Sequence, residues 1–238
     1  MAQYFINQIA IKNNKFEADI DESRHIMKVA RHKIGDEIKI FDGAGKRYLA
    51  TINLHDRKRV SGSIKSEIIS SAHRTELTLC FAPAQKTAVE EILEHCTETG
   101  VTSFMPIITN RTQGNYMDKW KRKKDRFKQI LLSASKQSER AFIPDLLEPK
   151  SFREIFDGED IVFFAAPDGD SLENCQADFK NIETAKIIIG PEGGFAPEEI
   201  AFAKTKKAVF IKISRHILRS ETAAIAASSL LLGRLDEK

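Results

Sequence analysis

The first 70 residues alternate between apolar and polar positions over short distances, which is typical of strands with one buried face. A turn signal of Asp, Gly, Ala and Gly at residues 42–45 separates two such runs and predicts a hairpin. We expect strands at residues 37–41, 47–52 and 59–64, and one short helix at 23–30 with Ile26, Val29 and Ala30 on its buried face. This pattern predicts a small β-barrel, followed by a polar linker at 70–73.

After residue 75 the pattern changes to strands that alternate with helices. We expect strands at residues 77–81, 101–108, 160–165, 185–189 and 208–213, and helices at 87–99, 118–138 and 221–235. Most positions in two of the strands, 160–165 and 185–189, are apolar, so we expect these strands to be buried on both faces. The alternation predicts an α/β domain with a parallel sheet and helices on both sides.

Composition narrows the class of protein. Of the 238 residues, 42% are hydrophobic and 30% are charged, which argues against disorder as the main state. No apolar run approaches the roughly 20 residues of a membrane helix, and the N-terminus lacks the pattern of a signal peptide. The three cysteines are far apart and form no CxxC pair, so we expect a reducing, cytoplasmic environment.

Positive charge is concentrated in two blocks. Residues 1–74 hold 14 Lys and Arg against 9 Asp and Glu, and residues 111–140 hold 10 against 3. The rest of the chain is acidic, with 13 against 22. Two basic blocks on an otherwise acidic protein indicate a polyanion contacted at two places. A solvated, lysine-rich helix face is the alternative for either block.

A glycine-rich turn follows the apolar strand at 185–189. Residues 190–195 read Gly-Pro-Glu-Gly-Gly-Phe, and Pro197 then suits the first turn of a helix. In α/β sheets, ligands bind beyond the carboxyl ends of strands, where this turn is placed. The turn matches neither GxGxxG nor a phosphate-binding P-loop, and glutamates follow it, so a neutral or cationic ligand is favoured. A tight turn without a ligand is the alternative.

A second polar segment follows the last strand. Ser220 suits the cap of the final helix, and Arg219 and Glu221 flank it where the carboxyl edge of the sheet is expected. The helix that follows is rich in alanine from Ala223 to Ala227, which permits close packing. A capped helix with an incidental ion pair is again the alternative. The histidines lack metal-ligand spacing and no GxSxG motif is present, so we expect neither a metal site nor a nucleophilic serine.

Together these segments resemble the RsmE family of ribosomal RNA uridine N3-methyltransferases, within the SPOUT superfamily. The resemblance covers nearly the whole chain. It rests on residues 24–52, 94–101, 106–111, 137–140, 190–195 and 217–224, of which the last two segments are specific when found in this order. The family commonly has glycine where Glu139 stands, glutamate where Lys136 stands, a Ser or Thr cap where Ala196 stands, and often glycine where Ser214 stands.

The resemblance implies a PUA-like RNA-binding β-barrel over residues 1–70 and a SPOUT domain with a deep trefoil knot over residues 75–238. It implies that S-adenosylmethionine binds in the knot loops, which are the loop after Ala165, the turn at 190–195 and the segment at 213–223. The implied cofactor-binding residues are Ala165, Gly190, Pro191, Glu192, Gly193, Gly194, Phe195, Ile213, Ile217, Leu218, Ser220 and Ala223. It also implies a homodimer, with the alanine-rich helix at its interface.

The same resemblance implies 16S ribosomal RNA of the small subunit, or its assembly intermediate, as partner and substrate. The expected RNA-binding residues are Arg24, His25, Arg31, Arg47, Lys86, Arg111, Arg122, Lys123, Arg126 and Arg140. Glu221 is the expected base for the N3 proton, with Glu192 as its rival, and Arg219 is expected to stabilise developing negative charge.

Three other functions remain open from the sequence. Ribose 2′-O-methylation would keep the superfamily and change the reaction. A non-catalytic RNA-binding or assembly protein would use the basic blocks alone. A Rossmann-type metabolic enzyme is disfavoured, because residues 81–85 carry no glycine fingerprint after the first α/β strand.

Overall fold

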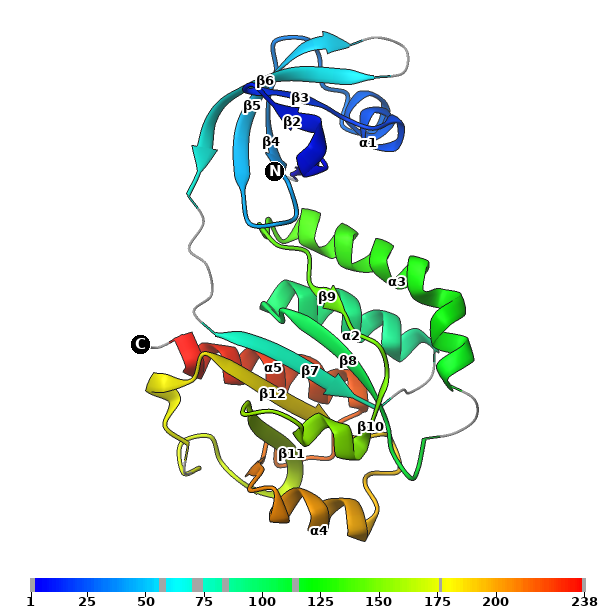
Figure 1. The fold of residues 1–238 in the computed structure, drawn as a ribbon, viewed down its shortest axis with the longest axis vertical. Helices are drawn as coiled ribbons and strands as arrows, with labels where there is room; N and C mark the ends of the chain where they lie inside the picture. Colours follow the sequence, from blue (N-terminus) through cyan, green and yellow to red (C-terminus); the bar gives the residue numbers. More distant parts are fainter. Residues whose placement is uncertain are drawn as a thin grey trace. The chain divides into compact units, whose positions relative to one another are not determined.

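A computed structural model describes residues 3–55, 59–69, 75–82, 86–112, 116–175 and 177–236, with the side chains of residues 55, 86 and 119 left out. The chain divides into two compact units (Figure 1). The first contains Met1–Ala72 and Leu132–Ile143, and the second contains His73–Leu131 and Pro144–Lys238. The linker expected at 70–73 lies outside the described residues.

The first unit is built on a six-stranded sheet with the order β1-β4-β5-β6-β3-β2. Its strands are β1 (Tyr4–Phe5), β2 (Ile11–Lys12), β3 (Lys15–Glu17), β4 (Glu37–Phe41), β5 (Arg47–His55) and β6 (Val60–Ile68). The predicted hairpin is confirmed as the antiparallel pair of β4 and β5. One face of the sheet covers a core that includes Phe16, Ile26, Ile38, Ile40 and Ile52.

The predicted helix at 23–30 is longer and less regular than expected. Helix α1 (Ile20–Arg24) continues as a π-helical turn, η2 (His25–Val29), closed by the bond from Ala30 N–H to the His25 carbonyl at 3.0 Å. The wider turn breaks the 3.6-residue spacing on which the predicted face rested. Ile26 is buried, but Val29 is 69% exposed and Ala30 is also exposed, so the assignment of these two residues to the buried face was wrong.

The first unit also includes a segment that comes late in the chain. Residues 132–143 belong to it, whereas the sequence placed them in the second domain. Polar contacts hold this segment: the Gln3 amide donates to the Ser135 carbonyl at 3.2 Å, and Lys136 pairs with Glu22 at 2.8 Å. These contacts join residues that are more than 100 positions apart, so they could not be predicted from local sequence patterns.

The second unit is built on a seven-stranded parallel sheet. Its order is β10-β8-β7-β12-β11-β13, and β9 pairs with β8. The strands are β7 (Glu76–Phe81), β8 (Ser103–Ile108), β9 (Asp145–Leu146), β10 (Lys150–Ser151), β11 (Ile161–Asp170), β12 (Thr184–Ile189) and β13 (Val209–Ile211). All its pairings are parallel, as predicted.

Helices cover this sheet because its strands alternate apolar side chains toward both faces. They are α2 (Lys86–Thr99), α3 (Tyr116–Gln137, which continues into the first unit), α4 (Pro197–Thr205) and α5 (Ser220–Asp236), with short 3₁₀ turns η3 (Phe152–Phe156) and η4 (Phe179–Asn181). Helix α5 packs against α2, β7 and β12. No helix in the described part of the chain is long and apolar enough to cross a membrane.

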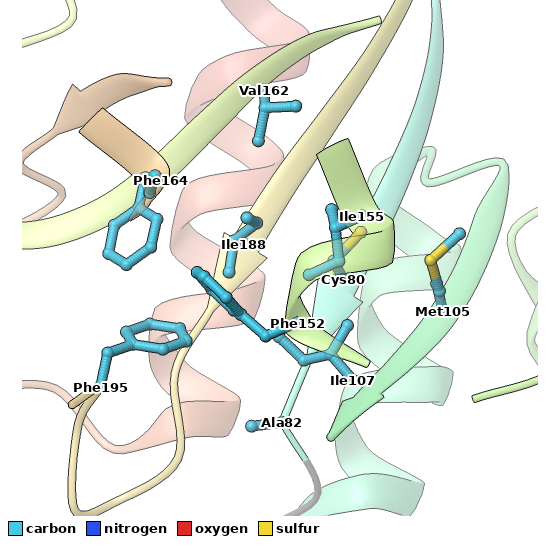
Figure 2. Close-up of a cluster of buried hydrophobic side chains, with 11 residues drawn as sticks. Cys80, Ala82, Met105, Ile107, Phe152, Ile155, Val162, Phe164, Ile188 and Phe195 are labelled. Carbon is cyan, nitrogen blue, oxygen red and sulfur yellow. The ribbon is translucent and has the colours of Figure 1, made fainter. Parts of the chain in front are cut away.

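One face of the sheet carries an aromatic core (Figure 2). Phe152 from η3, Phe164 from β11 and Phe195 from the turn after β12 bring their rings together, with centroids 4.6 Å apart between Phe164 and Phe195. Because Phe195 is buried, the glycine-rich turn that precedes it is fixed against the carboxyl edge of the sheet.

Candidate active site

A cavity of about 360 Å³ lies at the carboxyl ends of β11, β12 and β13. Segments from four places in the chain line it: the second half of β11, the turn after β12, residues that follow β13, and the start of α5. Of the twelve residues predicted to bind a cofactor, the structure brings eleven to this cavity. They are Ala165, Gly190, Pro191, Glu192, Gly194, Phe195, Ile213, Ile217, Leu218, Ser220 and Ala223.

Gly193 is the exception. It does not line the cavity, and its carbonyl accepts a hydrogen bond from the Arg111 guanidinium. Arg111, which was predicted to bind RNA, lies across the glycine-rich turn with an exposed side chain, and its contact with RNA stays a prediction. The Arg111 contact therefore links the turn after β8 to the turn after β12.

Two glycines of the turn are required by its geometry. Gly194 has a φ of +69°, in the left-handed region that side chains with a Cβ rarely adopt. At Gly190, a Cβ would lie 2.7 Å from the Phe195 ring, so any larger residue would displace this ring from the aromatic core. The cavity wall therefore requires glycine at 194 because of its left-handed backbone, and at 190 because of the close Phe195 ring.

The helix after the turn is capped through a glutamate. Ala196 has no side-chain oxygen for the cap position, but Glu199 accepts a hydrogen bond from Ala196 N–H at 2.8 Å. The second carboxylate oxygen of Glu199 accepts from Asn110 N–H at 2.9 Å. Glu199 is buried, and these two amides compensate for its desolvation. It holds the turns after β8 and β12 together, beside the Arg111 contact.

The segment before α5 places the expected catalytic residues next to the cavity but not in its wall. Arg219 is exposed and Glu221 is half-buried, and neither lines the cavity. Ser220, between them, is buried in the wall, and its hydroxyl donates to the Glu221 carboxylate at 3.3 Å. Ser220 is the first residue of α5 rather than its cap, because Ala223 N–H bonds the Arg219 carbonyl at 2.8 Å.

The cavity wall carries negative rather than positive charge. Asp168 and Glu192 contribute carboxylates, and no Lys or Arg occurs among the described residues that line it. A phosphate-bearing ligand would therefore meet repulsion and no cationic partner. A cationic ligand without phosphate fits this wall.

The residues named from the sequence left out nine wall residues: Phe164, Ala166, Pro167, Asp168, Ile189, Ile200, Phe210, Ser214 and His216. Five of them, at 166–168, 214 and 216, lie in segments that the family resemblance implied as cofactor-binding loops. The reason is clearest for residues 166–168. The predicted strand ended at Ala165, whereas β11 runs to Asp170 with a register shift against β13. Gly169 permits this course, since a Cβ there would lie 2.6 Å from the Ile211 backbone. The Pro-Asp-Gly-Asp run at 167–170 was the available signal for an irregular strand.

Three of the expected RNA-binding residues lie on or near η2. Arg24 is exposed and lies 3.6 Å from Asp21, and Arg31 is exposed with a φ of +59°. His25 is half-buried, and its Nδ1 lies 3.2 Å from the Lys136 ammonium. Because an ammonium group can only donate, Nδ1 accepts in this contact. Arg24 and Arg31 therefore remain accessible to an anionic partner, whereas His25 contacts a residue of the late segment.

Two other expected RNA-binding residues have partners within the first unit. Arg47 pairs with Glu139 at 2.9 Å and donates to the Gln3 amide oxygen at 3.0 Å, with only 14% of its side chain exposed. Arg140 is half-buried, and burial lowers its pKa to about 10, which leaves it protonated at neutral pH. Both side chains contribute to the packing of the first unit. The side chain of Lys86 lies outside the described residues.

On α3, the three expected RNA-binding residues do not share one face. Arg122 and Arg126 are exposed, and Arg126 pairs with Glu90 of α2 at 3.1 Å. Lys123 is half-buried, on the side of the helix that carries Phe127 and Ile130. Lys123 is therefore poorly placed to reach an RNA backbone together with the other two.

Comparison with known families matches both units. A family described as "RNA methyltransferase domain" matches residues 71–232. A second, described as "RNA methyltransferase PUA domain", matches residues 18–65. The first match alone covers more than half of the chain.

Individual relatives match along most of their length. A protein from Rickettsia conorii named "Ribosomal RNA small subunit methyltransferase E" is 28% identical over 229 residues, which cover 94% of this chain and 91% of the relative. A protein of the same name from Synechocystis is 28% identical and covers 85% of this chain and 68% of the relative.

Solved structures share the fold at low sequence identity. One is a ribosomal RNA small subunit methyltransferase E from Neisseria gonorrhoeae bound to S-adenosyl methionine, with a TM-score of 0.86 at 22% identity, covering 98% of this chain and 97% of that chain. Another is a putative methyltransferase from Legionella pneumophila in complex with the cofactor SAM, with a TM-score of 0.86 at 24% identity and the same coverage.

Proposed function

Since the chain belongs to the RNA methyltransferase family whose model matches residues 71–232, we propose that it methylates N3 of a specific uridine in 16S ribosomal RNA, with S-adenosylmethionine as the methyl donor. The observation that carries this proposal is the cavity at the carboxyl ends of β11, β12 and β13. Eleven residues singled out by the family resemblance converge there from separate segments of the chain.

The cavity suits the proposed cofactor in charge and in shape. S-adenosylmethionine, when bound, supplies a methyl group activated by its sulfonium. The carboxylates of Asp168 and Glu192 and the absence of Lys and Arg among the described wall residues favour a cationic, phosphate-free molecule. The backbone at Gly194 is open to a ligand, because nothing nearer than the Arg111 guanidinium, at 3.9 Å, would meet a Cβ there.

The chain's own residues have three tasks in the proposed reaction. They hold the uracil ring so that N3 faces the cavity, accept the N3 proton, and stabilise the negative charge that develops on the ring. We assign proton acceptance to Glu221, which is half-buried beside the cavity wall, and charge stabilisation to the exposed Arg219. Glu192, which lines the cavity and is exposed, is the alternative base.

The target uridine has to leave a base pair or a stack, because N3 lies on its Watson–Crick edge. We assign the grip on the surrounding phosphates to exposed cations of both units, with Arg24 and Arg31 in the first unit and Arg122 in the second. The substrate is then 16S ribosomal RNA in the small subunit or in its assembly intermediate, which places the reaction in the cytoplasm.

We further propose a homodimer. Ile217 is 95% exposed although it lines the cavity, and Leu230 on α5 is 50% exposed. Large exposed apolar side chains, such as Ile217 at the cavity and Leu230 further along α5, are typical of surfaces that a second chain covers. The trefoil knot implied by the family resemblance also remains a prediction.

The decisive experiment is methyl transfer from labelled S-adenosylmethionine to 16S ribosomal RNA, both naked and in small subunits. A methyl group at N3 blocks base pairing and stops reverse transcription at one uridine. A ribose 2′-O-methyl group instead protects the neighbouring phosphodiester from alkaline cleavage, which would support that alternative. A protein that binds RNA but neither binds S-adenosylmethionine nor transfers a methyl group would be the non-catalytic alternative, and the proposal would be wrong.

The assigned role of Arg219 has its own test. We expect Arg219→Ala to leave RNA affinity nearly unchanged and to slow single-turnover methyl transfer by about 100-fold, the usual loss for one charge-stabilising donor. A rate within a few-fold of the wild type would show that Arg219 only flanks the helix.

A further inference from the structure

Three lysines of α3 lie on one stripe of the helix. Lys121, Lys124 and Lys128 follow the spacing i, i+3 and i+7, which confines them to about 60° of the helix circumference. Lys121 and Lys128 are exposed, and the Lys124 side chain is 34% exposed. The side of α3 next to this stripe, about a quarter-turn away, is fixed in the second unit by Trp120 and Phe127, whose ring centroids are 4.8 Å apart.

Glu148 faces this stripe from a different part of the fold. Its carboxylate forms an ion pair and a hydrogen bond with the Lys124 ammonium. The residues beside Glu148 are fixed on the sheet: Leu147 N–H donates to the Phe104 carbonyl at 2.9 Å, and Lys150 pairs with β8 in parallel register. The Glu148 side chain, 57% exposed, is therefore presented beside α3 by an ordered connection between β9 and β10.

All three lysines act on the Glu148 carboxylate. Its pKa is lowered, first by the hydrogen bond from Lys124 and then by the positive charges of Lys124, Lys121 and Lys128. Of the three lysines, only Lys124 contacts Glu148, and the three ammonium groups outnumber the carboxylates of Glu148 and Asp125 at this place. This is the local environment that a phosphate oxygen of a nucleic acid backbone requires.

We propose that Lys121, Lys124 and Lys128 form a phosphate-binding surface for the RNA substrate, and that Glu148 occupies this surface until an RNA phosphate displaces it. The inference rests on the proposed function. It adds a second RNA-binding surface, at which the Glu148 carboxylate competes with RNA phosphates for the lysines. Glu148 lowers affinity for RNA with few phosphates in reach, and it is displaced by RNA that engages all three lysines together.

The three lysines belong to the basic block at 111–140, but the residues named for RNA binding on this helix were Arg122, Lys123 and Arg126. Arg122 donates to the Asp118 carbonyl of its own helix at 3.3 Å, and Arg126 pairs with Glu90 at 3.1 Å. Both arginines lie more than a quarter-turn from the three lysines, toward the far side of α3. Asp125 is exposed on the same side as Lys121 and Lys128. It offers a matched control, because its removal changes the charge of the same helix face without freeing Lys124.

The test compares Glu148→Gln with Asp125→Asn in filter binding to 16S ribosomal RNA at several salt concentrations. We expect Glu148→Gln to tighten binding by roughly twofold to fivefold at low salt, the scale of one exposed charge contact, and to steepen the salt dependence by up to about one phosphate contact. Asp125→Asn should give a clearly smaller change. Equal effects of the two substitutions would mean that only net charge matters, and the proposal would be overturned.

A second comparison asks whether the gain depends on the lysines. In the variant Lys121→Ala/Lys124→Ala/Lys128→Ala, we expect a salt slope lower by about 2, and no further gain from Glu148→Gln. A gain that persists without the lysines would overturn the proposal. Lys121 and Lys128 are exposed, and Lys124 contributes one ion pair at the surface, so thermal unfolding of the triple variant should stay close to that of the wild type.

Methyl transfer by the wild type separates this inference from the proposed function. A wild type that transfers no methyl group to RNA would remove the proposed function and this inference together. A wild type that methylates RNA, combined with Glu148 and lysine variants that bind RNA as the wild type does, would overturn the phosphate-binding surface alone.

Discussion

At the scale of single residues, Glu139 shows how this chain accommodates a departure from the family it resembles. Its φ of +56° lies in the left-handed region, where the family commonly has glycine. Its carboxylate pairs with Lys39 at 2.8 Å and with Arg47 at 2.9 Å, and these contacts offset the backbone strain. Lys136, the other departure nearby, pairs with Glu22 at 2.8 Å.

The Glu139 ion pairs predict a pH dependence of stability. Hydrogen bonds and positive charge from Lys39 and then Arg47 lower the pKa of Glu139 below its usual 4.5. A carboxylate with a lowered pKa in the folded state stabilises the protein above the unfolded pKa, and this contribution is lost as the pH falls through the folded one. In melting experiments from pH 7 to pH 3, Glu139→Gln should therefore show a shallower acid limb than the wild type. Parallel curves would contradict the prediction.

Gly194 predicts a loss of cofactor affinity that is separable from lost stability. Valine at a φ of +69° is strained by its β-branched side chain, and it would also place methyl groups in the cavity wall. We expect Gly194→Val to abolish S-adenosylmethionine binding in calorimetry. The control is Gly35→Val, at a φ of +92° with open space around the Cβ and far from the cavity in sequence. It should cost similar stability and leave cofactor affinity unchanged; weakened affinity in both variants would contradict the role of Gly194.

At the scale of elements, the sequence pattern predicted the regular strands and helices, but it did not predict the segments with irregular backbone. The strand at 185–189 and the helix at 87–99 differ from β12 and α2 by one residue at the start, because a short apolar run defines the strand and apolar residues at helical spacing define the helix. The π-helical turn at His25–Val29 and the extension of β11 to Asp170 depend on long-range contacts, which local spacing does not encode.

The residues of the candidate site likewise fall into those that the sequence pattern predicted and those that it did not. The glycine-rich turn and the residues before α5 could be predicted, because parallel strands place their following turns at one edge of the sheet. Spacing did not single out the wall residues Asp168 and His216, because the chain after Ala165 and after Ile213 has no periodic signal, although the family resemblance implied the loops that contain them. The resemblance supplied specific residue assignments that spacing alone left open.

The alanines of α5 predict that a larger side chain on the buried side of this helix lowers the stability of the protein. Ala227 is fully buried in the helix that packs against α2, β7 and β12. Ala227→Leu adds three carbons to this contact and should destabilise the protein by about 1–3 kcal/mol in urea unfolding. Ser229→Leu, at an exposed position of the same helix, should change stability by no more than about 0.5 kcal/mol. A similar cost for both would show that the effect belongs to the helix and not to its buried side.

At the scale of the whole molecule, the proposed homodimer has a surface test. Leu230 is 50% exposed on α5, and a charge there would be unfavourable inside an interface. We expect the wild type to be dimeric at micromolar concentration in light scattering, and Leu230→Glu to shift it toward the monomer without loss of helix content. A monomeric wild type with full methyl transfer activity would rule out the dimer.

The late segment of the first unit affects when that unit can fold during synthesis on a ribosome. Gln3, Glu22, Lys39 and Arg47 have partners in residues 132–143, so the nascent chain exposes these polar groups without those partners until residue 143 has been added. About 70 further residues follow Ala72 before this point, which takes roughly 4–14 s at usual bacterial elongation rates of about 5–20 residues per second. During this interval the β4–β5 hairpin can form, but the first unit still lacks residues 132–143. The speed of translation through residues 73–143 therefore sets the earliest time at which the first unit can fold completely.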